Sequence, residues 1–131
     1  MANANVTLNA SASYTNNTDS QTPLNRAFAP IIYQATTVWY NPFFMAGTVQ
    51  GNLNVPTGEY FNAVIIKNLS ASATVSVFVA AGGVPASPSC ILGPGGIFML
   101  VNSGVAGTSG LDQLQVLASA ADTPIEYLVA Y

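Results

Sequence analysis

Residues 61–79, FNAVIIKNLSASATVSVFV, predict two β-strands joined by a short polar turn. The first strand, Phe61–Lys67, is almost continuously apolar, whereas the second, Ala73–Val79, alternates as a strand with one buried face does. The alternation sets Val75, Val77 and Val79 against Thr74, Ser76 and Phe78. Between the strands, Asn68, Ser70 and Ser72 can hydrogen-bond nearby backbone groups in a turn. Because a single hairpin is marginal in water, we expect further strands to cover this one.

Short runs of β-branched and aromatic residues recur on both sides of this hairpin, separated by loops rich in Gly, Pro, Asn and Ser. These runs occupy residues 6–14, 27–40, 49–55, 90–92, 97–101, 111–118 and 125–131. No stretch has a convincing helical period. Short strands at this spacing are typical of sandwiches and barrels. The predicted fold class is therefore all-β: an antiparallel β-sandwich, jelly-roll-like, of about eight strands.

The chain of 131 residues is most simply one domain. We place the β-sandwich in residues 26–131. Residues 1–25 are rich in Asn, Ser, Thr and Ala, and they predict an extended N-terminal arm or a first strand, with turn residues at 16–23. Such an arm would pair with the body or reach a neighbouring subunit; the alternative is a frayed terminus.

The charged fraction of the chain is 5%, against about 25% in typical soluble proteins. Since low charge favours association, this composition predicts a protein in contact with copies of itself or with a larger assembly; the alternative is a monomer with an uncharged surface. The net charge is −3 and only Arg26 and Lys67 are positive, so we expect no nucleic-acid binding and no docking on anionic membranes. No apolar run could span a bilayer, and residues 1–11 lack the basic and apolar regions of a secretory signal.

The side chains that most enzymes and metal sites use are scarce. The chain contains no histidine and one cysteine, Cys90, which excludes histidine triads and thiolate zinc clusters. We interpret Cys90 as a buried structural thiol of a protein made in a reducing compartment. The five carboxylates are scattered singly, although Asp112 and Glu126 could form a glycosidase-like pair in space. We therefore expect no enzyme activity, and we assign no catalytic, cofactor-binding or metal-binding residue.

Aromatic residues supply the candidate interaction site. A cluster at Trp39, Tyr40, Phe43 and Phe44 has three interpretations: core, subunit interface, or a sugar-stacking platform assisted by Asn41. Two further aromatic side chains and Leu117 fall on the predicted outer faces of their strands, which suggests that a second layer or another subunit covers those faces. The candidate interface residues are Trp39, Tyr40, Phe43, Phe44, Phe78 and Phe98.

From Leu53 to Tyr131 the chain resembles the small decoration, or cement, proteins of tailed phages and related head-fibre pieces. The shared sequence pattern consists of LNVPTGEY, a strand ending in IIKN, then SATVSVFVAAGG, ILGPGGIFML and a final strand, IEYLVAY. The resemblance implies a jelly-roll-like fold, a homo-oligomer such as a trimer, and a place on the capsid surface, where the protein would clamp subunits of the major capsid protein. It implies no catalytic residue, and residues 1–25 lie outside it.

We therefore expect a structural virion protein, made in the host cytoplasm, that decorates or cements a phage capsid through homo-oligomeric contacts. The main alternative is a carbohydrate- or receptor-binding β-sandwich module of a phage tail or fibre that uses Trp39 and Tyr40. A third class, an enzyme, would need two of the carboxylates within about 10 Å of each other in a cleft.

Overall fold

The computed structural model describes residues 4–9, 11–14, 24–27, 31–35, 37–53, 59–101 and 110–131. Within these ranges every regular element is a β-strand, and none is a helix. Eight of the strands form two antiparallel four-stranded sheets, which confirms the prediction of an all-β antiparallel sandwich. The jelly-roll topology stays a prediction.

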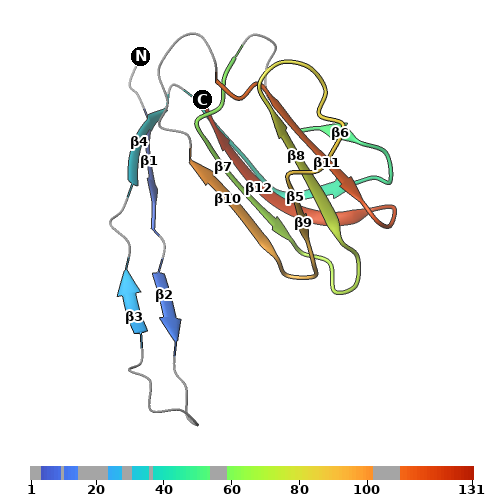
Figure 1. The fold of residues 1–131 in the computed structure, drawn as a ribbon, viewed down its shortest axis with the longest axis horizontal. Coiled ribbons are helices and arrows are strands. Elements are labelled where there is room, and N and C mark those ends of the chain that lie inside the picture. Colours follow the sequence, from blue (N-terminus) through green and yellow to red (C-terminus); the bar gives the residue numbers. More distant parts are fainter. Residues whose placement is uncertain are drawn as a thin grey trace.

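The first sheet has the order β10-β7-β12-β5, and the second has the order β6-β11-β8-β9. Figure 1 shows the two sheets as layers that face each other. The first sheet consists of β10 (Ile97–Val101), β7 (Ala63–Asn68), β12 (Thr123–Ala130) and β5 (Val38–Ala46). The second sheet consists of β6 (Gly51–Asn52), β11 (Gln113–Ala118), β8 (Val75–Ala80) and β9 (Cys90–Leu92).

Four N-terminal strands pair with one another rather than with these two sheets. β1 (Ala4–Leu8) pairs with β4 (Ile31–Ala35), and β2 (Ser11–Tyr14) pairs with β3 (Leu24–Ala27). Figure 1 shows the two ladders one after the other, beside the sandwich. Part of residues 1–25 lies outside the described residues, so the predicted N-terminal arm and the predicted domain boundary at residue 25 stay predictions.

Between the two sheets lies one apolar core. It is built from alternate side chains of the facing strands, as expected for two sheets that each bury one face. The valines of β8 that the alternation placed on one side, Val75, Val77 and Val79, all belong to this core or pack against it. The largest fully buried side chains include Leu53, Phe61, Ile66, Leu114, Ile125 and Tyr127.

The segment that predicted a hairpin forms two strands in different sheets. β7 pairs with β10 and β12, whereas β8 pairs with β9 and β11. Both predicted strands are confirmed, but their predicted pairing with each other is wrong. Both strands contribute apolar side chains to the same core. They therefore face each other across it, and the polar segment 69–74 carries the chain from one sheet to the other.

Gly93–Gly96 connects the two sheets a second time, through a tight turn. Pro94 precedes Gly95, which has a φ of 72°, and the Gly96 amide donates a hydrogen bond of 2.9 Å to the Gly93 carbonyl. A proline followed by a residue with positive φ, closed by this bond, is the pattern of a type II turn. The turn sets the start of β10.

We predict that Gly96→Ala lowers the melting temperature by about 5 °C, equivalent to roughly 1–2 kcal/mol of unfolding free energy. A Cβ atom on residue 96 would lie 2.9 Å from the carbonyl oxygen of Gly93, a backbone atom that the turn itself fixes. Gly93→Ala is the matched control, because no heavy atom lies within 4 Å of its added Cβ. Thermal unfolding followed by circular dichroism compares the two variants, and equal melting temperatures would contradict the prediction.

Candidate interaction surface

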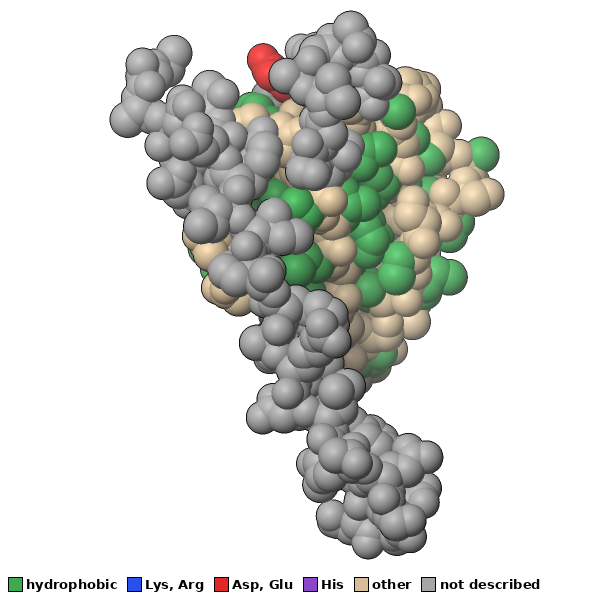
Figure 2. Space-filling view, turned by 60° about the vertical axis from the view of Figure 1, so that its left-hand side comes forward, with side chains coloured by type: hydrophobic (Ala, Val, Ile, Leu, Met, Phe, Trp, Pro, Cys, Tyr) green, Lys and Arg blue, Asp and Glu red, His purple; other side chains and the backbone are tan. Residues whose placement is uncertain are grey.

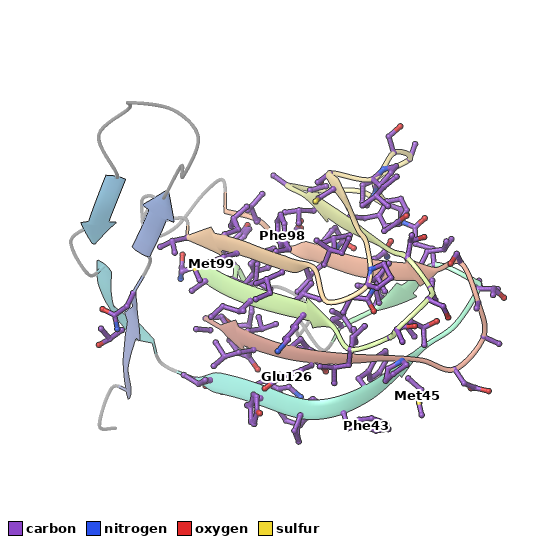
Figure 3. All side chains as sticks on the ribbon, turned by 90° about the horizontal axis from the view of Figure 1, so that it is seen from below. Phe43, Met45, Phe98, Met99 and Glu126 are labelled. Atoms are coloured by element: carbon purple, nitrogen blue, oxygen red, sulfur yellow. The ribbon has the colours of Figure 1, made fainter. Side chains whose placement is uncertain are left out.

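The first sheet presents an apolar face to the outside of the sandwich. We call this side, which points away from the second sheet, the outer face. Its large exposed apolar side chains are between 42% and 59% exposed: Tyr40, Phe43 and Met45 on β5, and Ile97 and Met99 on β10. The strand registers place Met99, Ile65, Leu128 and Tyr40 in one row across the four strands. Figure 3 shows Phe98 directed into the sandwich, and Phe43, Met45 and Glu126 on the other side of the sheet.

A second apolar cluster lies at one end of the outer face. Ala63 and Ala130, paired across β7 and β12, are 0% exposed and do not belong to the main core. The partly buried side chains packed against them are Val38, Ile65, Val101 and Leu128. Figure 2 shows one side of the molecule, on which hydrophobic side chains far outnumber charged ones among the described residues. On the outer face, the registers and the burial of the side chains place apolar residues on all four strands.

The charged side chains described on the outer face are Lys67 and Glu126, which are direct partners across β7 and β12. The Tyr40 hydroxyl donates a hydrogen bond of 2.7 Å to Oε1 of Glu126. This hydrogen bond, together with smaller effects of desolvation and of the negative charge of Glu126, raises the pKa of the Tyr40 hydroxyl. The hydrogen bond also occupies one oxygen of the Glu126 carboxylate.

The six predicted interface residues divide between the surface and the interior. Trp39, Tyr40 and Phe43 are exposed. Phe44 and Phe98 pack against the core, and the ring of Phe44 meets Tyr127 edge to face at a centroid distance of 5.7 Å. The predicted outward position of Phe98 is wrong: in β10 the alternate residues Ile97 and Met99 are the exposed ones.

Phe78 lies on the side of β8 opposite the core valines, as the alternation predicts, but it is only 5% exposed. Its ladder partner, Gln115, is buried as well. The Gln50 amide donates hydrogen bonds to Gln115 Oε1 and to the Pro85 carbonyl, so the loop after β8 reaches this face of the second sheet. The cover predicted for Phe78 therefore comes from its own chain, and Phe78 is not available to another subunit.

Trp39 and Tyr40 do not form one platform for a sugar ring. They are consecutive residues of β5, and successive side chains of a strand point to opposite faces. Trp39 pairs with Val129 of the core, whereas Tyr40 pairs with Leu128 of the outer face. The Asn41 Oδ1 atom accepts a hydrogen bond of 3.0 Å from the Phe43 amide, a local contact within the irregular part of β5.

The two carboxylates that could have formed a catalytic pair have separate roles. Asp112 Oδ1 accepts a hydrogen bond of 2.6 Å from the Gly82 amide, at the end of the second sheet, whereas Glu126 lies on the outer face of the first sheet. The described residues contain no group of three or more acidic, cysteine or histidine side chains that could hold a metal ion. Cys90 is partly buried against the core rather than fully buried, and its thiol forms no disulfide.

Asn68 carries a structural role that the sequence analysis found only in part. Its side chain is fully buried, and its Nδ2 atom donates to the carbonyls of Ala73, Leu92 and Gly93 at 2.8, 3.3 and 3.0 Å. Its Oδ1 atom accepts from the Ser70 amide at 3.0 Å, as the turn prediction implied. The hydrogen bonds to residues 92 and 93 connect the two segments that carry the chain between the sheets, 69–74 and 93–96. These segments are far apart in the sequence, and no local sequence pattern predicts the contact between them.

Comparisons with protein-family models, with curated proteins and with solved structures found no match to this chain. The likeness to phage decoration proteins therefore remains a resemblance of sequence rhythm. A search for membrane-spanning segments among the described residues found no helix with the length and hydropathy to cross a bilayer.

Proposed function

We propose that this protein is a structural component of a phage capsid surface, which decorates or cements the shell by packing its outer face against copies of itself and against capsid subunits. The observation that carries the proposal is the outer face, where Tyr40, Phe43 and Met45 are exposed at one edge of the sheet and Ile97 and Met99 at the other, with the partly buried Ile65 and Leu128 between them. Apolar surface of this kind gains free energy when it leaves water, and contiguous patches commonly mark interaction sites.

The composition of the outer face matches that of a protein interface. Interface centres are enriched in Tyr, Phe and Met and depleted of charge. Here the two charged groups described, Lys67 and Glu126, have opposite signs and lie side by side, so a close neighbour meets little net charge. The charged fraction of 5% for the whole chain reduces repulsion between closely spaced copies in the same way.

A cementing role needs many modest contacts rather than one tight site. A stable contact between two proteins buries about 1,600 Å² in total, roughly half of it on each partner. On a capsid lattice each copy touches several neighbours, so the contacts add avidity. The resemblance favours a trimer as the form that binds the capsid.

The proposal is tested on phage particles assembled with and without this protein. We expect mass spectrometry to find the protein in purified particles, and we expect particles without it to lose infectivity at a lower temperature. Light scattering of the isolated protein should give the mass of an oligomer. If the protein is absent from purified particles and their heat resistance does not depend on it, the proposal is wrong.

A further inference from the structure

The four edge strands of the sandwich differ in how they prevent pairing with another chain. An edge strand carries unpaired backbone groups, and short length, proline or a bulge protects it. β6 has two residues and β9 has three. β5 contains Pro42, and its register with β12 shifts between Ile125 and Tyr127. β10 (Ile97–Val101, IFMLV) has five apolar residues, no charge, no proline and a regular register with β7.

The ladder between β10 and β7 shows which backbone groups of β10 point outwards. At its start the Asn68 amide donates to the Gly96 carbonyl, and the Asn68 carbonyl accepts from the Gly95 amide. In antiparallel pairs, hydrogen-bonded and non-hydrogen-bonded positions alternate. Phe98 and Leu100 therefore bond to β7. The amides and carbonyls of Ile97, Met99 and Val101 point to the edge, where no described strand pairs with them.

We propose that β10 pairs antiparallel with β10 of a second copy, around a twofold axis at Met99. This inference deepens the proposed function, because it rests on self-association and names one contact that produces it. In this register Met99 lies opposite its own counterpart, and Ile97 lies opposite Val101 of the second copy. Each of these three residues then exchanges one donated and one accepted backbone hydrogen bond with the other copy, and the two first sheets become one continuous sheet.

A second copy of β10 fits this edge on both of its faces. An axis through a residue pairs outer-face side chains with outer-face side chains, so the exposed Ile97 and Met99 meet apolar neighbours. It also pairs Phe98 with Leu100, and both of these pack against the core. An axis between two residues would instead pair core side chains with outer-face ones. Since β10 carries no charge, self-pairing brings no like charges together.

Cross-linking tests the register directly. In a Cys90→Ser background, Met99→Cys should form a disulfide-linked dimer under mild oxidation, because paired Cα atoms at a hydrogen-bonded position lie about 5.5 Å apart, within disulfide range. Ile97→Cys is the matched control. Its two copies would be offset by four residues, or about 13 Å, which no disulfide spans. Failure of Met99→Cys to cross-link, or equal cross-linking by Ile97→Cys, would overturn the proposal.

A second pair of variants separates backbone pairing from side-chain packing. Met99→Pro removes an amide that points to the edge and leaves the bonds to β7 intact, and proline is tolerated on edge strands in that orientation. Met99→Thr removes the apolar side chain but keeps the amide. We expect light scattering to give the same mass for the parent chain and for Met99→Thr, and a lower mass for Met99→Pro, whose far-ultraviolet circular dichroism spectrum should be unchanged. Dissociation by Met99→Thr to the same extent would overturn the proposal.

Wild-type measurements keep the proposal testable if Met99→Pro does not fold. The amides of Ile97, Met99 and Val101 should exchange with deuterium more slowly as the protein concentration rises, whereas those of Phe98 and Leu100 should be protected at all concentrations. Exchange at residues 97, 99 and 101 that is independent of concentration would overturn β10 pairing. A trimer that binds phage particles but shows no Met99→Cys cross-link would overturn the twofold contact and leave the capsid proposal standing. A cross-linked dimer that is absent from purified particles would overturn the capsid proposal and leave the twofold contact standing.

Discussion

Asn68→Ala is expected to lower the melting temperature by about 10 °C. The substitution removes a buried amide group that donates to the carbonyls of Ala73, Leu92 and Gly93. A buried carbonyl that loses its partner costs about 1–3 kcal/mol; because the Gly93 carbonyl keeps its hydrogen bond from the Gly96 amide, losing the bonds to Asn68 should cost about 2–4 kcal/mol in total. For a chain of this size each kcal/mol corresponds to roughly 3–4 °C. Thermal and urea unfolding of the parent chain and of Asn68→Ala measure the change in melting temperature and in unfolding free energy.

Ser70→Ala is the matched control for this prediction, because it changes the same turn at a residue that is only partly buried. Ser70 Oγ accepts hydrogen bonds from the amides of Ser72 and Ala73 at 3.2 and 2.9 Å, and water can replace it at the surface. Its loss should cost about 1 kcal/mol or less. If Asn68→Ala lowered the free energy of unfolding no more than Ser70→Ala does, the Asn68 side chain would not be what connects segments 69–74 and 93–96.

The double substitution Phe43→Lys and Met45→Lys is expected to weaken self-association at least 100-fold. Both side chains lie on β5 at the outer face, and burial of each contributes about 1.5–3 kcal/mol when it is complete. Each tenfold change in affinity corresponds to about 1.4 kcal/mol, and two buried lysines would add a desolvation penalty. Sedimentation equilibrium measures the association constant. The melting temperature of the isolated chain should change little, since neither side chain is part of the core.

The matched control is Val49→Lys with Val84→Lys. These residues are 79% and 72% exposed, neither lies on a strand of the first sheet, and the change in net charge is the same. This variant should associate as the parent does. Equal weakening by both double variants would show that net charge, rather than the outer face, governs association. Because both altered residues lie on β5, the double variant leaves the residues of the β10 edge unchanged.

The sequence predicted the strands better than their partners. Alternation in residues 73–79 identifies a strand and the side that it buries, and the structure confirms both for Val75 and Val77. It contains no information about the neighbouring strand. Two strands that bury valines and isoleucines in one core can be side by side or face to face, and here β7 and β8 face each other. The hairpin prediction failed because a turn of short polar residues suits both arrangements.

The orientation of β10 was not predictable for a different reason. Residues 97–101 are apolar on both sides, so the pattern does not distinguish the face of Phe98 from that of Met99. Phe78 was placed on the correct side of β8, but the alternation does not show that its own chain buries it there. Trp39, Tyr40 and Phe43 are exposed as an interface requires. Only the register with β12 shows that Trp39 and Tyr40 belong to opposite sides of the sheet.

The order of strands within the first sheet has a consequence for biosynthesis. β5 pairs with β12 and with no other strand in that sheet, although the two are separated by most of the chain. During translation the aromatic segment 38–46 therefore cannot pair within its sheet until residues 123–130 have left the ribosome. We expect closure of the sandwich to be limited by the slow encounter of these distant segments. Chaperones would then have a long interval in which to engage the nascent polypeptide.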